Sequence, residues 1–111
     1  MMHAKNGIRM ALRDYAKFHE MFDELKPLTQ AMYGLLNEAI NHCGLNEMEE
    51  RVLAYRYVTP HDPSQPVLGA ADVIGVSRDT VMRYSESLTV KITDYMNERG
   101  VDYYERHYIR L

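Results

Sequence analysis

The chain has 111 residues, 46% of them hydrophobic, and its 13 Lys and Arg against 16 Asp and Glu give a formal net charge of −3. This length fits one domain with a buried core, and no apolar run approaches the roughly 18 residues that cross a bilayer, which argues against a membrane protein. The first residues lack the apolar segment of a signal peptide, and the single cysteine, Cys43, excludes an intramolecular disulfide framework. We therefore expect a cytoplasmic protein.

Two amphipathic helices are predicted at the start of the chain, because apolar residues recur there every three or four positions. The first runs from about Ile8 to Leu25 and stops before Pro27, with an apolar face of Ile8, Leu12, Tyr15, His19 or Phe18, Phe22 and Leu25. The second opens at Pro27 and ends at Gly44, with an apolar face of Leu28, Met32, Leu35, Leu36, Ala39, Ile40 and Cys43. Residues 1–44 are expected to form a helical pair that serves packing or dimerisation.

A third helix is predicted to start at a capping box, in which Asn46 is the N-cap and Glu49 reaches back to it. It carries Met48, Val52, Leu53, Tyr55 and Tyr57 and fades near Val58. The stretch Thr59–Pro66 has three prolines in eight residues, which predicts a loop. No convincing strand is present, so the sequence predicts an all-α helical bundle.

The stretch from Leu68 to Tyr84 predicts a short helix, a glycine turn and a long second helix, which is a helix-turn-helix unit. Gly75 supplies the positive φ of the turn, and Ala71 is small enough for a close helix crossing. Val76 and Val81 are the apolar residues that hold the two helices at a fixed angle. Ser77 stands where an N-cap belongs, and the second helix is expected to run from Arg78 to Gly100.

The long helix keeps one apolar face for about five turns, formed by Val81, Tyr84, Leu88, Ile92, Tyr95 and Met96. Tyrosines at helical spacing among aliphatic residues are expected in the core or at its boundary; these are Tyr55, Tyr57, Tyr84 and Tyr95. Residues 101–111 form a tyrosine-rich tail that adds at most a turn or two of helix. Its Tyr103, Tyr104 and Tyr108 are the better candidates for an interface with another molecule.

The third helix and the glycine turn resemble the helix-turn-helix of sigma-70 region 4, and more closely the small phage regulators of the ArpU and RinA type. The resemblance covers roughly Leu45 to Met96. It is carried by "Glu-x-x-Val-Leu-x-x-Arg-Tyr" and "Gly-Val-Ser-Arg-x-Thr-Val", here Glu49, Val52, Leu53, Arg56, Tyr57, Gly75, Val76, Ser77, Arg78, Thr80 and Val81. It implies that residues 45–100 are a DNA-binding region and that the protein regulates transcription in a phage or prophage.

A second motif helix in a major groove would present Ser77, Arg78, Asp79, Thr80, Met82 and Arg83 to double-stranded DNA. Arg78 and Arg83 are the candidates for guanine edges or phosphates, and Ser77 and Thr80 for phosphates or thymine methyl groups. Asp79 would accept a hydrogen bond from cytosine or favour the helix N-terminus through its charge. For Arg56, a phosphate contact and an ion pair with Glu49 or Asp72 both remain open.

The charge balance predicts that the isolated chain binds DNA weakly and needs a partner to add affinity, because affinity for nucleic acid depends on neutralising phosphates. From Val67 to the end there are six basic and seven acidic residues. A homodimer or RNA polymerase would supply the missing affinity. The alternative is an adaptor that keeps the fold but binds RNA polymerase or another regulator. No cofactor is expected, and the histidines and Cys43 lack the spacing of a metal site, so an enzyme is not expected either.

Overall fold

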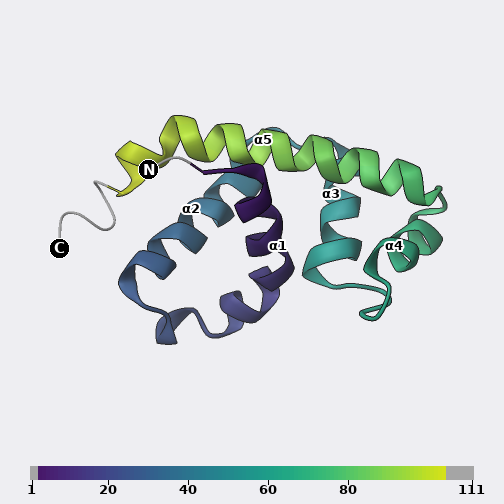
Figure 1. The fold of residues 1–111 in the computed structure, drawn as a ribbon, viewed down its shortest axis with the longest axis horizontal. Helices are drawn as coiled ribbons and strands as arrows, with labels where there is room; N and C mark the ends of the chain where they lie inside the picture. The colour runs from purple at the N-terminus through teal and green to yellow at the C-terminus, as the bar shows by residue number, and fades with distance from the viewer. Residues whose placement is uncertain (1–2, 105–111) are drawn as a thin grey trace.

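The computed structural model describes residues 3–104, which fold into α-helices joined by short connections (Figure 1). No strand occurs within this range, so the predicted all-α fold is confirmed. A 3-10 turn follows the first helix and a π-helical segment continues the third. In chain order the elements are α1 (Lys5–Glu20), η1 (Phe22–Glu24), α2 (Pro27–His42), α3 (Glu47–Val52), η2 (Leu53–Val58), α4 (Pro66–Ile74) and α5 (Arg78–Tyr104).

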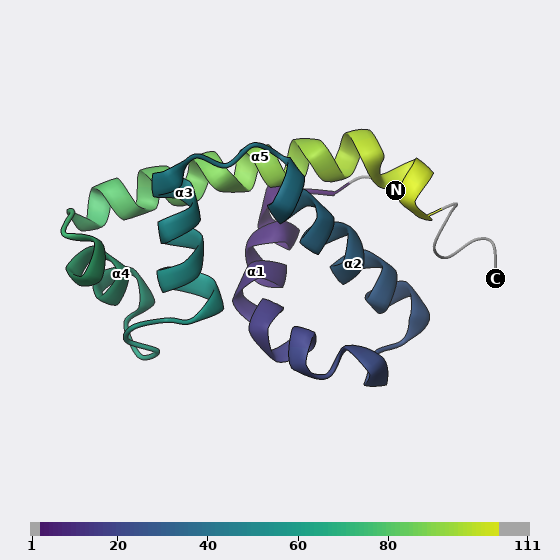
Figure 2. The same ribbon diagram turned by 180° about the vertical axis from the view of Figure 1, so that it is seen from behind.

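The long helix α5 runs along one side of the molecule, and the other helices pack beneath it (Figure 1, Figure 2). α2 lies under its C-terminal half, α1 under its middle, and α3 and α4 under its N-terminal half. The connection from α2 to α3 crosses α5, as Figure 2 shows from behind. At this crossing Gly44 adopts a left-handed φ of 83°, as its predicted role at the end of α2 requires, and Lys91 Nζ donates to its carbonyl at 3.3 Å.

A single hydrophobic core joins both halves of the molecule. Helix α5 contributes Val81, Leu88, Ile92 and Met96, all with no exposed surface. Small polar residues one turn apart, Ser85, Thr89 and Thr93, are buried beside them, whereas Tyr84 and Tyr95 are only half-buried at the edge. The buried face of α5 is therefore wider than the predicted apolar face. The other helices contribute Ile8, Ala11, Leu12, Ala31, Tyr33, Leu35, Leu36, Ala39, Val52, Leu53, Tyr57, Ala70 and Ala71.

The first helix is shorter than predicted: α1 ends at Glu20, not Leu25. The chain has to reverse before α2 can lie beside α1, and it does so through η1, where the Leu25 N–H donates to the Phe22 carbonyl at 3.1 Å. Gln30 Nε2 donates to the same carbonyl at 2.9 Å. Phe22 and Leu28, both predicted on apolar faces, are consequently exposed at this end of the hairpin.

The last helix is longer than predicted, because Gly100 does not end it. Helix α5 continues to Tyr104, and Gly100 is buried within it. The extra turn brings Tyr103 against α2, where its hydroxyl lies 2.1 Å from the position of a Cβ added to Gly34. Tyr103, predicted as an interface with another molecule, thus packs within its own chain; Tyr108 and the side chain of Tyr104 lie outside the described residues.

The third helix begins as predicted. Asn46 Oδ1 accepts from the Glu49 N–H at 2.8 Å, and Glu49 Oε1 accepts from the Asn46 N–H at 2.9 Å, which completes the capping box. The helix then widens into η2, which ends at Val58. Tyr57 is buried there, but Tyr55, two residues away on the opposite side of the helix, is exposed, so its predicted packing role is wrong.

Gly69→Ala is expected to destabilise the fold by roughly 1 kcal/mol, although alanine favours helices over glycine by a similar amount. Gly69 is buried in α4 beneath the proline loop, and an added Cβ would lie 2.7 Å from the backbone nitrogen of Asp62. Backbone cannot yield as a flexible side chain does. Urea denaturation followed by circular dichroism measures the change, with Gly7→Ala as the control. Gly7 has no atom within 4 Å of its added Cβ, so that variant should be stabilised; equal gains in both would contradict the close approach.

Candidate nucleic-acid interface

A glycine turn sets the angle between α4 and α5. Gly75 has a left-handed backbone, with φ 81° and ψ 37°, at the C-terminus of α4. Its N–H and that of Val76 both donate to the Ala71 carbonyl, at 2.8 and 3.0 Å, so the last turn of α4 is closed. Val76 packs against the core and Val81 is fully buried. The roles predicted for Gly75, Val76 and Val81 agree with this geometry, and Ala71 is buried.

Ser77 caps α5 as its position predicted. Its Oγ accepts from the Thr80 N–H at 3.1 Å, and its carbonyl accepts from the Val81 N–H at the same distance. The Ser77 and Thr80 hydroxyl groups are 2.9 Å apart and share a hydrogen bond. These two hydroxyl groups are therefore already engaged with each other at the start of the helix.

The remaining predicted site residues occupy the outer side of the first two turns of α5. Arg78, Asp79, Met82 and Arg83 are exposed, whereas Thr80 is half-buried. Within residues 3–104 none of the three ion pairs includes Arg78 or Arg83; the pairs are Lys5–Glu86, Arg9–Glu86 and Lys91–Glu49. Arg83 makes one long hydrogen bond, 3.5 Å, to Thr80 Oγ1. Both guanidinium groups are thus available to an external acceptor.

The buried carboxylate of Glu49 joins α3 to α5. Glu49 has no exposed side-chain area, and its carboxylate accepts from Lys91 Nζ at 2.6 Å and from the Ser87 hydroxyl. Burial alone would raise the pKa of Glu49, but hydrogen bonds from the Asn46 N–H, Lys91 and Ser87 outweigh it and lower the pKa. The predicted alternative of a Glu49–Arg56 ion pair is therefore wrong, because Glu49 is occupied by Lys91.

Arg56 lies in η2, where its guanidinium carbon is 4.8 Å from the centre of the Tyr57 ring. Burial, together with the positive charges of Arg13 and Arg9, lowers the pKa of Arg56. Arg9 and Arg13 lie between the apolar positions of the first helix, so their approach to Arg56 depends on the tertiary fold. The structure therefore adds cationic residues from α1 to those predicted on α5.

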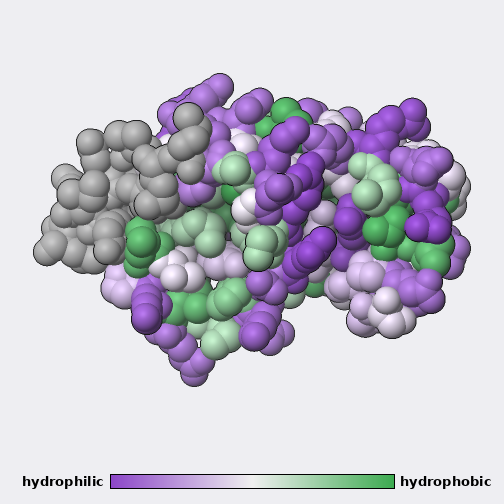
Figure 3. Space-filling model, in the orientation of Figure 1, coloured by the Kyte–Doolittle hydropathy of each residue, from purple (hydrophilic) through white to green (hydrophobic). Residues whose placement is uncertain are grey.

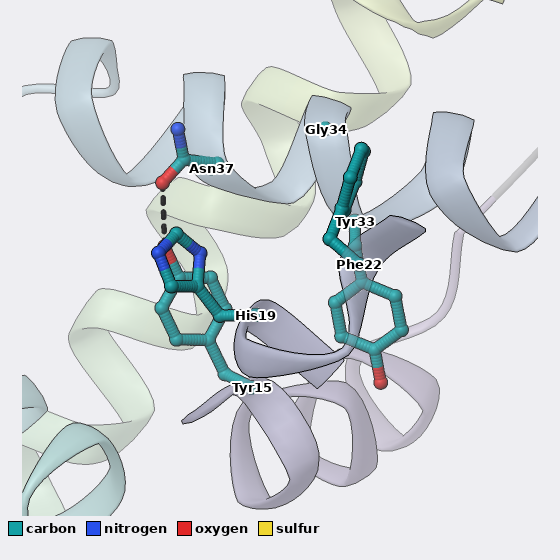
Figure 4. Close-up of a pocket in the computed structure, with 6 residues that line it drawn as sticks. All are labelled: Tyr15, His19, Phe22, Tyr33, Gly34 and Asn37. Atoms are coloured by element: carbon teal, nitrogen blue, oxygen red, sulfur yellow. Dashed lines mark hydrogen bonds between the residues drawn. The ribbon is translucent and has the colours of Figure 1, made fainter. Parts of the chain in front are cut away.

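An apolar hollow of about 280 Å³ opens between α1 and α2, away from the start of α5. Figure 4 shows its lining of Tyr15, His19, Phe22, Tyr33, Gly34 and Asn37. The Tyr15 and His19 rings stack with centres 5.7 Å apart, and the Tyr15 hydroxyl donates to Asn37 Oδ1. Burial and the nearby Asp14 carboxylate raise the pKa of Tyr33 to about 12. The hollow therefore offers neutral aromatic surface and no charged acceptor of hydrogen bonds.

No group of three or more His, Cys, Asp and Glu side chains within residues 3–104 is arranged to hold a metal ion. None of the helices in the same range is both long and apolar enough to span a bilayer. Comparison of the chain with protein-family models, with curated proteins and with solved structures finds no match.

Proposed function

We propose that this protein binds double-stranded DNA in a sequence-specific way and regulates transcription, with the start of α5 lying in the major groove. The observation that carries the proposal is the pair of arginines on the outer side of the first two turns of α5, Arg78 and Arg83, neither of which forms an ion pair with any of residues 3–104. The resemblance of the third helix and the glycine turn to sigma-70 region 4 and to phage regulators of the ArpU and RinA type supports the same function.

The surrounding geometry suits groove insertion. Helices of this kind read base edges with their N-terminal residues, and here the Gly75 turn ends α4 and the Ser77 cap begins α5 directly after it. Arginine can donate two parallel hydrogen bonds to guanine O6 and N7, and Met82, about half of whose surface is exposed, supplies apolar contact area. Asp79 lies in the first turn of α5, where its charge also favours the helix N-terminus.

An electrophoretic shift with random genomic fragments, at low and at physiological salt, tests for DNA binding. We expect complexes that weaken steeply as salt rises, because phosphate contacts release counterions. If no fragment is bound at either salt concentration, DNA binding by the isolated protein is refuted. The acidic net charge would then favour the second candidate, an adaptor that presents the same surface to RNA polymerase or another regulator.

Arg83→Ala is expected to weaken binding to a preferred duplex by about 1–3 kcal/mol and to relax the preference at one base pair, if Arg83 contacts a base edge. The measurement is a titration by fluorescence anisotropy with the preferred duplex and its single-base variants. Arg99→Ala is the matched control, because Arg99 is exposed near the other end of α5, where it lies against Tyr95. Equal affinities and preferences for Arg83→Ala and the wild type would remove Arg83 from the site.

A further inference from the structure

Basic side chains from two distant parts of the sequence meet on one surface between α1 and η2. Lys5, Arg9 and Arg13 recur at every fourth position of α1, which places them on one side of that helix. Arg56 of η2 lies close enough for the charges of Arg13 and Arg9 to act on it. We call these four residues the α1 basic ridge. In Figure 3 a hydrophilic band crosses the molecule over this region, between two hydrophobic areas.

One end of the ridge borders a hollow of about 380 Å³. Arg13 and Arg56 line it together with Tyr57 and the prolines Pro60, Pro63 and Pro66. Neither arginine belongs to an ion pair within residues 3–104, although acidic residues outnumber basic ones in the chain. Proline contributes no backbone N–H to this lining, so the two guanidinium groups dominate its chemistry. Such a site favours an anion that can accept hydrogen bonds from two arginines.

Two residues that line this hollow also lie beside the proposed DNA-reading end of α5. A second hollow, of about 260 Å³, is lined by Arg78 and by the first turn of α4, and both hollows share Pro66 and Val67. At the other end of the ridge, Lys5 and Arg9 both contact Glu86, which lies one turn after Arg83 on α5. The ridge is therefore separated from Arg78 at one end by Pro66 and Val67, and from Arg83 at the other end by Glu86.

We propose that the α1 basic ridge binds the phosphate backbone of DNA, with Arg13 and Arg56 holding one phosphate in the hollow while the start of α5 lies in the groove. This inference rests on the proposed function and adds the N-terminal helix to the DNA contact. It supplies a source of phosphate affinity in an acidic protein without requiring a second subunit.

Glu86 opposes this binding in the free protein. Its carboxylate accepts hydrogen bonds from Lys5 and Arg9, which lower its pKa, and the side chain remains 46% exposed. A phosphate that approaches Lys5 or Arg9 has to compete with Glu86 and is also repelled by it. Removing the Glu86 charge should therefore strengthen DNA binding, whereas removing Arg13 or Arg56 should weaken it.

The test measures the affinity of wild type and variants for one duplex that the wild type binds, between roughly 50 and 200 mM salt. Arg13→Gln/Arg56→Gln is expected to bind about tenfold more weakly and to lower the slope of log affinity against log salt by about 1, as the loss of one phosphate contact predicts. Arg13→Gln alone should show part of this loss. Arg99→Gln removes one positive charge, as Arg13→Gln does, but far along α5, and it should leave the slope unchanged.

Glu86→Gln should bind several-fold more tightly than the wild type, a gain that loss of folding cannot produce. Thermal unfolding identifies any variant that fails to fold. If the double variant with Arg56→Gln fails to fold, Arg13→Gln and Glu86→Gln still test the proposal, because both residues are exposed and the two substitutions should change the affinity in opposite directions. A wild type that binds DNA while all these variants keep its affinity and salt slope would overturn the ridge and leave the proposed function standing. A wild type that binds no duplex would overturn both.

Discussion

Leu88→Ala is expected to lower the free energy of unfolding by about 2–5 kcal/mol. Leu88 has no exposed surface and lies at the middle of α5, in the core that joins both halves of the molecule. Truncating Leu88 removes buried apolar contacts and leaves a cavity that the helices packed beneath α5 cannot fill. Because domains of this size are stable by only about 5–15 kcal/mol, the loss is a large share of the total.

Urea denaturation monitored by circular dichroism measures this change, and Val90→Ala is the matched control. Val90 lies two positions along the same helix, on its exposed side. Alanine costs nothing in helix propensity there, so the control should stay within about 0.5 kcal/mol of the wild type. Equal midpoints for Leu88→Ala and Val90→Ala would contradict a core centred on α5.

Glu49→Ala should cost roughly 2–3 kcal/mol, because the substitution removes half of the capping box and the buried partner of Ser87 and Lys91. The neighbouring Glu50 is exposed, so Glu50→Ala is the control and should change stability little. Stability is again measured by urea denaturation at neutral pH. A loss in Glu49→Ala no greater than that in Glu50→Ala would show that the carboxylate does not fasten α3 to α5.

The Glu49 carboxylate also makes the stability of the fold depend on pH, in a direction that follows from its pKa. The pKa of Glu49 is lower in the folded protein than its ordinary value of 4.5, so its charge stabilises the fold at any pH above that value. This contribution is lost as pH falls from 4.5 through the lower folded value. Glu49→Gln has no charge to lose at this position. The difference in free energy of unfolding between the wild type and Glu49→Gln should therefore narrow as the solution is acidified.

Features set by neighbours in the sequence could be predicted from the residues alone. The Asn46–Glu49 capping box, the left-handed Gly75 and the Ser77 cap each depend on backbone groups within four positions. The start of α2 at Pro27 has the same local origin. The turn that presents the candidate site was therefore predictable in detail.

Features set by contacts between distant residues could not be predicted in this way. The chain reversal at η1 ends α1 early, and the contact of Tyr103 with Gly34 accompanies a further turn of α5 beyond Gly100. Spacing along α1 does reveal that Lys5, Arg9 and Arg13 share a helix face. Their meeting with Arg56 and Glu86, which extends the candidate site beyond α5, appears only when α1 is packed against η2 and α5.

Selection of bound duplexes from a random pool, with the solution mass of the complex determined alongside, tests sequence-specific DNA binding most directly. We expect enrichment of a short motif whose binding weakens with salt and depends on Arg83. If the protein binds as a dimer, the motif should contain two half-sites about one DNA turn apart. A pool that remains random after repeated rounds, at salt concentrations where the protein is folded, would contradict sequence-specific binding.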